Sequence, residues 1–327
     1  MFNRFIIIML VMALGLMVGH SRLHAQCFAS PGNPIAGNTN LGILDRGITR
    51  AIGFVQYSLM DQYFEGSRRS DYDPTGAITS AHYTYTGFSL GYGLTGKLTL
   101  EAEVGYFLNR TQQYRHIDYS MRSSGFANAI VTAKYNLFQD LPRNLELTLS
   151  AGPKIPLTTK PQVADGVELP IGMQSSTGNF GFVVQSFFVK EFDVGSIRLI
   201  LINRYENNLT ENQQGYAFGD SFMSSLFFSK HLANPWTRLT KDITFILQTR
   251  HEYRTRSTRN GQQINYSGHN LLFVAPQLNY NLGMVWNFSV MVDIPLYQYF
   301  NGIQLGNSHA ITFSVARDVG YRVKSEK

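Results

Sequence analysis

The chain has 327 residues, and charged residues make up only 15% of it, against about 25% in ordinary soluble domains. Aromatic residues reach 13%, and the mean hydropathy is −0.12. The formal net charge of +6 is too small to indicate a nucleic-acid partner, so we expect none. Beyond the N-terminus, no apolar stretch is long enough to form a membrane-spanning helix.

The first 25 residues predict a secretory signal peptide. Arg4 precedes an uncharged apolar run from Phe5 to Val18, which is shorter than the roughly 20 residues of a membrane helix. We expect cleavage after Ala25. This removes two arginines and no acids, and leaves 26 basic and 22 acidic residues, a net charge of +4. Cleavage and lipidation at Cys27 is an alternative; otherwise this single cysteine is an unpaired thiol.

Residues 48–320 show a repeated alternation of apolar and polar side chains. In 97–109, Leu98, Leu100 and Ala102 fall on one face, and Thr99, Glu101 and Glu103 fall on the other. A period of two residues indicates β-strands with one apolar and one polar face. Repeated behind an export signal, it predicts an all-β fold, a transmembrane antiparallel up-and-down β-barrel of an outer membrane.

We expect twelve strands in this barrel. They cover 48–64, 79–93, 97–109, 123–138, 145–156, 178–190, 196–208, 217–231, 242–257, 266–281, 286–298 and 307–320. The short connections are 94–97, 139–144, 190–195, 231–241 and 281–285, and the longer ones surround 65–78, 110–122, 157–177, 209–216, 258–265 and 299–306. Short periplasmic turns and long outer loops are typical of bacterial barrels. The sheet must close because lipid offers edge amides no partner.

Four segments make up the predicted domain organisation. They are a signal peptide at 1–25, a periplasmic or plug segment at 26–47 that is rich in Gly, Asn and Pro, the barrel at 48–320, and a tail at 321–327. The longest outer loop, 157–177, contains two prolines. It either folds into the pore or extends into solvent.

Charged residues within the strands share the parity that is predicted to face the lumen. In 196–208, Arg198 and Arg204 alternate with the lipid-facing Ile197 and Leu199. The candidates for lining the lumen are Glu101, Glu103, Lys134, Lys154, Arg198, Arg204, Arg250, Glu252 and Asp293. The lipid-facing row of 123–138 is expected to be Ala127, Ala129, Val131, Ala133, Tyr135 and Leu137.

Aromatic residues gather near the predicted strand ends, as in the two girdles of membrane barrels. The outer girdle is expected to hold Tyr63, Phe64, Tyr83, Tyr85, Phe107, Tyr253, Tyr297 and Phe300. The inner girdle is expected to hold Tyr135, Phe138, Phe192, Trp236, Tyr280 and Trp286.

Glu101 and Glu103 lie on one face of a predicted strand, about 6–7 Å apart. Lys134, inward on the next strand, is at a similar height, so the three predict a charged cluster. Two interpretations stay open. The cluster either consists of ion pairs that hold the shape of the barrel, or it forms a charged constriction that filters solutes.

The sequence contains no nucleophile elbow, no phosphate loop and no paired-cysteine metal motif. Ser267, His269 and Asn270 are the one suggestive cluster, but Ser267 and His269 share the inward parity. A phospholipase of the outer membrane would need them on the lipid face. We therefore expect no enzyme, no cofactor and no metal site.

The segment 150–188 resembles an outer-membrane transporter-like family named for the meta-pathway of phenol degradation. The matching positions are Gly152, Lys154, Pro156, Thr177, Gly178 and Asn179. The stretch 27–42 also resembles N-termini of such barrels. The resemblance implies uptake of small hydrophobic or aromatic compounds, and it carries no binding residue across. The C-terminus departs from it, because six residues follow Tyr321 where such barrels end on an aromatic residue.

These observations predict a channel or transporter for small solutes in the outer membrane of a Gram-negative cell. Twelve strands make a narrow tube, so side chains decide whether it conducts. The expected partners are outer-membrane lipid, lipopolysaccharide and a small-molecule solute. The alternative is a closed structural or adhesive barrel that acts through its outer loops.

Overall fold

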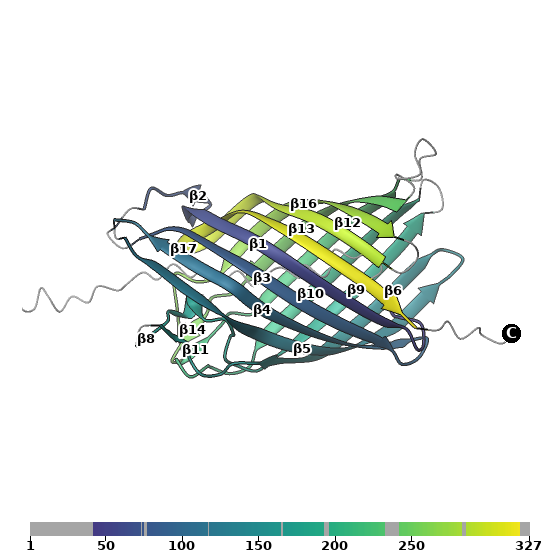
Figure 1. Cartoon of the computed structure of the whole chain (residues 1–327), viewed down its shortest axis with the longest axis horizontal. Coiled ribbons are helices and arrows are strands. Elements are labelled where there is room, and N and C mark those ends of the chain that lie inside the picture. The colour runs from purple at the N-terminus through teal and green to yellow at the C-terminus, as the bar shows by residue number, and fades with distance from the viewer. Residues whose placement is uncertain are drawn as a thin grey trace, which may run out of the picture.

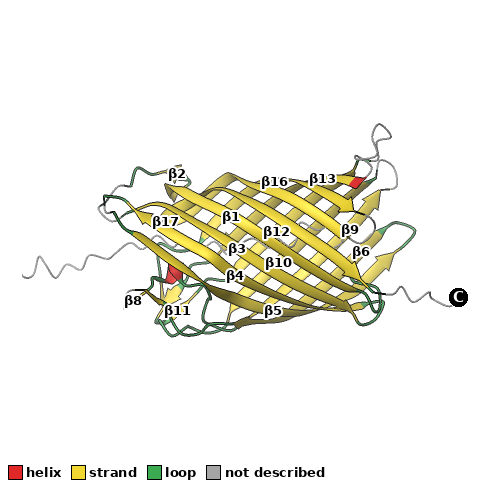
Figure 2. Cartoon of the chain, viewed as in Figure 1, coloured by secondary structure: helices red, strands yellow, loops and turns green. Residues whose placement is uncertain are grey.

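The computed structural model describes residues 42–320, except 73, 75–76, 117, 165, 193–195, 233–241 and 283–285. These residues form a closed antiparallel β-barrel (Figures 1 and 2). Its wall consists of β1 (Thr49–Gly66), β3 (Ile78–Gly93), β4 (Leu98–Tyr114), β5 (Ser120–Asp140), β6 (Leu145–Pro156), β9 (Gly181–Phe192), β10 (Ile197–Asn208), β12 (Ser221–His231), β13 (Ile243–Arg254), β16 (His269–Leu282) and β17 (Trp286–Val319). No helix in the described ranges is long and apolar enough to cross a membrane.

The barrel closes between its first and last strands. Sequence neighbours pair throughout, from β1 beside β3 to β16 beside β17, and β17 also pairs with β1. The first half of β17 pairs with β16 and its second half with β1, with Gly302 at φ 70° between them. The Ser289 and Ser314 hydroxyls, one from each half, are 2.5 Å apart. Since β17 thus folds back and crosses the wall twice, the prediction of a barrel of about twelve strands is confirmed.

Smaller elements lie at the end of the barrel that carries the long loops. They are β2 (Arg68–Arg69), which is hydrogen-bonded to β1, the hairpin of β7 (Val163–Ala164) and β8 (Val167–Glu168), the 3-10 helix η2 (Ile171–Met173), and a small sheet of β11 (Tyr216–Ala217), β14 (Thr258–Arg259) and β15 (Gln262–Gln263). Figure 1 shows β2, β8, β11 and β14 at one end, while β1 begins and β17 ends at the other. We call the end that carries the long loops the loop end, and the end where β1 begins and β17 ends the turn end.

Two of the predicted long loops are wrong. Residues 299–306 belong to β17, and the loop predicted at 110–122 shrinks to 115–119 because β4 and β5 extend into it. Register shifts occur in both places, for example between Phe107 and Arg110 where β4 pairs with β5. A bulge interrupts the alternation of side chains without ending the strand, and sequence periodicity therefore underestimates the strand length.

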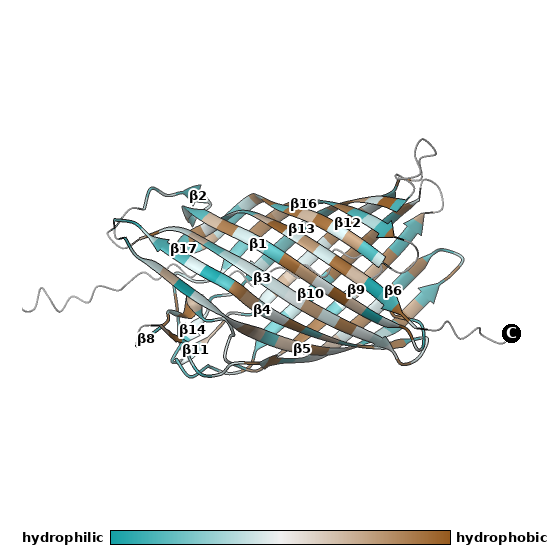
Figure 3. Cartoon of the chain, in the orientation of Figure 1, coloured by the Kyte–Doolittle hydropathy of each residue, from teal (hydrophilic) through white to brown (hydrophobic). Residues whose placement is uncertain are grey.

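The two faces of the wall differ in polarity. On β5 the side chain of Val131 is 42% exposed on the outside, whereas those of Thr132 and Lys134 are buried inside. Figure 3 shows the resulting alternation of apolar and polar residues along the strands. The apolar outer face suits lipid, and the polar inner face holds the charged residues.

Ala127 is a correction to the predicted lipid-facing row. It is 8% exposed and packs inside the barrel in a cluster with Tyr83 and Phe107. The register of β5 against β4 shifts at this point, since Val104 pairs with Ala129 while Tyr106 pairs with Phe126. This bulge turns Ala127 inward although its parity matches that of Ala129.

The predicted outer girdle also needs correction. Tyr63, Tyr83, Phe107 and Phe300 are buried in internal clusters instead of facing lipid. Their position near the strand ends does not distinguish an interfacial ring from one that packs under the loops.

The loop 157–177 folds over the mouth of the barrel. Arg110 of β4 donates hydrogen bonds to the carbonyls of Gly172 and Gln174, at 2.5 and 2.6 Å. Ser123 of β5 donates to the carbonyl of Met173 at 2.7 Å. The loop therefore takes the inward alternative and covers the loop end.

At the turn end, residues 42–48 lie against the inner wall. The amide of Leu44 donates to Thr99 Oγ1 at 2.8 Å, and both residues are buried. The amides of Gly47 and Gly93 donate to the carbonyls of Gly93 and Ile48, each at 2.9 Å. Residues 42–47 are the described part of the predicted segment 26–47. The rest of it, the signal peptide at 1–25 and the tail at 321–327 lie outside the described residues.

Candidate functional site

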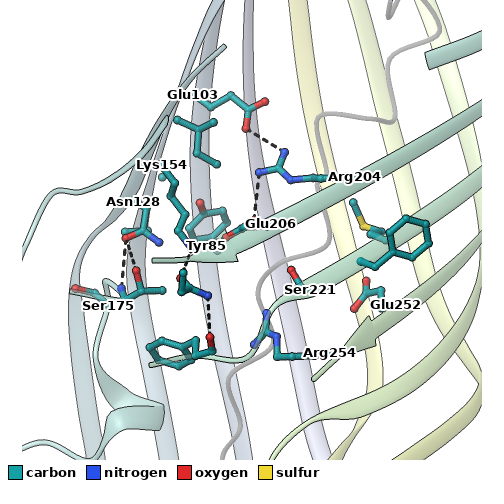
Figure 4. A pocket seen from close by; sticks show the side chains of 18 of the residues that line it. Tyr85, Glu103, Asn128, Lys154, Ser175, Arg204, Glu206, Ser221, Glu252 and Arg254 are labelled. Atoms are coloured by element: carbon teal, nitrogen blue, oxygen red, sulfur yellow. Dashed lines mark hydrogen bonds and ion pairs between the residues drawn. The ribbon is translucent and has the colours of Figure 1, made fainter. Parts of the chain in front are cut away.

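The barrel interior contains a partly open cavity of about 120 Å³ beneath the loop 157–177 (Figure 4). Its lining comes from opposite parts of the wall. One side is formed by β1, β3 and β4, the other by β6, β10 and β13, and Ser175 and Thr177 of the loop contribute from above. The cavity is therefore an internal chamber of the barrel.

Three aromatic rings form one wall of the cavity, and we call them the aromatic wall: Phe54, Tyr85 and Phe107. The ring centroids of Phe54 and Tyr85 are 5.7 Å apart, and those of Tyr85 and Phe107 are 4.8 Å apart. Offset or tilted packing at these distances is favourable for aromatic pairs.

Two glycines make room for these rings. A Cβ atom at Gly87 would lie 2.3 Å from the ring of Phe54, and one at Gly105 would lie 1.7 Å from the hydroxyl oxygen of Tyr85. Both contacts are far too short, so only glycine allows the rings to lie flat against the barrel wall. The glycines thereby set the position of the aromatic wall.

Charged residues form the opposite wall. Lys154 Nζ donates to Glu206 Oε1 at 2.8 Å and to Asn208 Oδ1 at 2.5 Å. Arg204 Nη2 lies 3.5 Å from Glu206 Oε2, and Arg204 Nη1 lies 3.7 Å from Glu103 Oε2. Figure 4 shows Glu103 approaching Arg204 from the far side. Because β5, β6 and β9 separate β4 from β10 in the sheet, the pair Glu103–Arg204 spans the lumen.

Arg250 holds a second group of charges. Its Nε donates to Glu252 at 2.6 Å and its Nη1 donates to Asp293 at 2.7 Å. The guanidinium also lies over the ring of Phe273, 4.7 Å from the centroid. Of these residues only Glu252 lines the cavity, so the group mainly ties β13 to β17 across β16.

The predicted cluster of Glu101, Glu103 and Lys134 is present, since the side chains of Glu101 and Glu103 contact each other, but the two acids have different ion-pair partners. Lys134 forms an ion pair with Glu101 and lies 4.8 Å from the ring of Phe187, whereas Glu103 pairs with Arg204. The nine lumen candidates thus occupy different places. Glu103, Lys154, Arg204 and Glu252 line the cavity; Glu101, Lys134, Arg250 and Asp293 are paired outside it; and Arg198 pairs with Glu191 at the turn end.

The aromatic wall was missed from the sequence, although a signal for it exists. Phe107 shares its parity with Glu101 and Glu103, so the alternation that placed the two acids inside applied to it as well. Its place near the expected strand end, with that of Tyr85, favoured the girdle instead. The strand continues to Tyr114, and this leaves Phe107 well inside it.

An apolar recess of about 630 Å³ lies on the outer face of the same strands. It is lined by residues of β1, β3, β4, β5 and β17, among them Val55, Phe88 and Phe126. Phe54, Val104 and Gly105 line both the recess and the cavity. The wall between lipid and cavity is therefore thin at this point.

The residues Ser267, His269 and Asn270 do not converge. The Ser267 hydroxyl donates to the carbonyl of Ile264 at 2.7 Å, and His269 lines the cavity beside Phe300. Asn270 hydrogen-bonds His251, at 2.8 Å. Within the described part of the chain, no group of His, Cys, Asp and Glu has the arrangement of a metal site.

No family model and no curated protein sequence matches the chain. Its structure is similar to that of an outer-membrane channel from Pseudomonas putida F1, with a TM-score of 0.66 and 13% identity over 86% of this chain and 99% of that one. It is less similar to the toluene transporter TodX of P. putida, with a TM-score of 0.43 and 8% identity over 85% and 91% of the two chains. The corresponding values for the monoaromatic hydrocarbon channel CymD are 0.41 and 8%, over 85% and 90%.

The likeness to the first of these structures shows a common fold. Together with the apolar outer face, it identifies the chain as a β-barrel of the cell outer membrane. The resemblance to the family named for the meta-pathway of phenol degradation stays a prediction, and so does the solute.

Proposed function

We propose that this protein is an outer-membrane channel for the uptake of small hydrophobic solutes, in particular aromatic ones. The observation that supports this most is the cavity. Its 120 Å³ is close to the roughly 150 Å³ of an apolar protein cavity that holds one benzene molecule. The aromatic wall offers such a ring a stacking surface.

The recess on the outer face supports a hydrophobic solute over a hydrophilic one. A solute dissolved in the outer leaflet gathers in an apolar recess because burial of its surface is favourable. Gly105 lies between the recess and the cavity, and the ring of Tyr85 rests on its inner side. Passage between the two spaces at this point requires the ring of Tyr85 to move away from Gly105.

The charged residues of the lumen then have a filtering role. The ion pair Glu103–Arg204 crosses the lumen, and residues 42–48 occupy part of the turn end. Both features oppose the free passage of large hydrophilic solutes. We propose that outer-membrane lipid and lipopolysaccharide surround the apolar face of the barrel.

A closed structural or adhesive barrel is the second candidate. It is supported by the loop 157–177, which covers the mouth, and by the hairpin β7–β8, on which Val163 and Val167 are exposed. Such a barrel would bind a partner through its loops and transport nothing.

Uptake of a labelled single-ring compound, such as benzyl alcohol, by whole Gram-negative cells tests the proposal. We expect expression of the protein to increase the initial uptake rate above that of the host. Gly105→Val should abolish the increase because the new side chain pushes Tyr85 into the cavity. Gly96→Val is the matched control, since nothing lies within 4 Å of a Cβ atom at Gly96.

Heat-modifiable migration on electrophoresis shows whether each variant forms the barrel. If folded wild-type protein leaves uptake at the host level, the channel is refuted and the closed barrel is supported. If Gly105→Val folds and transports like the wild type, the cavity is not on the route.

A further inference from the structure

We propose that Arg204 is an anion-binding residue of the cavity and that the preferred solutes are single-ring aromatic compounds with one carboxylate. This inference rests on the proposed function and narrows its solute class. It follows from the unusual way in which Arg204 is held.

Arg204 is 8% exposed, yet its contacts are long. Its two ion pairs measure 3.5 and 3.7 Å, beyond the 2.7–2.9 Å that is typical of charge-assisted hydrogen bonds. Nη1 has no hydrogen-bond partner among the described residues. In contrast, Lys154 and Arg250 each make two contacts of 2.5–2.8 Å. A buried guanidinium with an unused donor is costly, and it favours an acceptor that fills the gap.

The carboxylates nearest to Arg204 are not well placed to fill that gap. Glu206 already accepts a hydrogen bond from Lys154, and Glu252, which lines the same cavity, accepts one from Arg250. Glu103 reaches Arg204 only across the lumen, at 3.7 Å. A solute carboxylate inside the cavity approaches Arg204 without this constraint and replaces Glu103 as its partner.

A second unsatisfied polar group lies in the loop above the cavity. The hydroxyl of Ser175, in the loop above the cavity, is buried and also lacks a hydrogen-bond partner among the described residues. Both unused groups can donate hydrogen bonds. A planar carboxylate accepts two parallel hydrogen bonds from a guanidinium, and its ring then faces the aromatic wall.

The cavity also sets the size of the solute. At 120 Å³ it accommodates one ring and a small substituent, and Figure 4 shows Arg204 and Arg254 directed into the space that Tyr85 bounds on the other side. One end of the space is apolar, and the other carries charged residues of both signs, among them the unused donor of Arg204. A single ring with one carboxylate fits both ends, with the ring against the aromatic wall and the carboxylate on Arg204.

Calorimetric titration of the purified full-length protein with three matched compounds tests the inference. Benzoate, benzyl alcohol and benzylamine share a ring and differ in charge. We expect benzoate to bind most tightly. Arg204→Gln should weaken its binding roughly 10- to 100-fold, as expected for the loss of a charge-assisted hydrogen bond, and should leave benzyl alcohol nearly unchanged.

Two further variants separate binding from folding. Glu103→Gln should strengthen benzoate binding because it removes the competing carboxylate, whereas a purely structural role for the ion pair predicts no such gain. Arg198→Gln is the control, since Arg198 lies on the same strand and face but pairs with Glu191 at the turn end. Arg204→Lys keeps the charge without the bidentate geometry and should give an intermediate affinity.

Unchanged benzoate binding in folded Arg204→Gln would overturn the inference. It would also be overturned if benzylamine bound more tightly than benzoate and Glu103→Gln abolished this binding, because the cavity would then select a cation. In either case benzyl alcohol would still bind, and the proposed function would stand. If none of the three compounds binds to the wild-type protein, the proposed function fails and this inference fails with it. If Arg204→Gln does not fold, the other variants decide.

Discussion

Adjacent residues of β5 provide a sharp test of the two faces of the wall. Val131 faces lipid, 42% exposed, while its neighbour Ile130 lines the cavity and pairs across the strands with Glu103. We expect Val131→Arg to destabilise the barrel far more than Ile130→Arg. The substitutions introduce the same side chain one position apart, so only the direction of the side chain differs.

The magnitude follows from the depth of Val131. Exposed aromatic rings flank it on the outer face, Phe126 five residues before it and Tyr135 four residues after it. A tilted strand advances about 2.5 Å per residue along the membrane normal, so each ring lies roughly 10–12 Å away, and Val131 is near the midplane of a band about 25 Å tall. Arginine there costs about 2–4 kcal/mol.

At Ile130 the same guanidinium enters a polar cavity opposite Glu103. Glu103 on β4 attracts the new charge by roughly 0.2–1 kcal/mol, whereas Lys154, the partner of Ile130 on β6, repels it by a similar amount. The two effects largely cancel, and we expect a net cost below that of Val131→Arg, set mainly by the lost apolar contact of Ile130. Denaturant unfolding of the barrel in vesicles of fixed thickness measures both free energies. An equal or larger cost for Ile130→Arg would show that the faces are assigned the wrong way round.

Three further predictions concern ion pairs, the orientation of the barrel and the segment at its turn end. Arg250→Leu should cost about 3–5 kcal/mol in the same unfolding assay because it leaves two carboxylates unpaired inside the barrel. Arg198→Leu, which breaks a half-exposed pair, should cost less than about 1 kcal/mol, and equal costs would contradict this. A protease site inserted at Gly166, at the loop end, should be cleaved on whole cells, and one at Gly96, at the turn end, should not. The reverse pattern would show that the barrel has the opposite orientation in the membrane. Gly93→Ala should displace residues 42–48, because its Cβ atom would lie 2.1 Å from their backbone, and should thereby increase single-channel conductance in planar bilayers. Gly96→Ala should leave the conductance unchanged. If Gly93→Ala also leaves it unchanged, this segment does not restrict the pore.

Strict alternation in the sequence was enough to predict the barrel and the inward charges. Glu103, Arg204 and Glu252 lie on the predicted face because lipid and water impose opposite demands on neighbouring residues. The positions of the β-bulges could not be predicted in this way. Each shifts the parity of a strand by one residue, as at Ala127, and no residue type marks it reliably.

The partners of the charges also could not be predicted. Glu103 pairs with Arg204, which lies 101 positions further along the chain and four strands away around the barrel, instead of with the nearby Lys134. Sequence patterns give the direction of a side chain along its own strand. They give neither the height of a distant strand nor the path of a loop, and the cavity depends on both.

The seam between the first and last strands has a consequence for assembly. Arg50 of β1 donates two hydrogen bonds of 2.6 Å to Asp318 of β17, a residue 268 positions away. Almost the whole chain must therefore be synthesised before β1 finds its second neighbour. Until then two strand edges expose unpaired amide and carbonyl groups, which lipid does not tolerate. Contacts this distant in sequence form slowly. The unfinished barrel therefore needs an assembly partner that covers both strand edges until β1 and β17 pair.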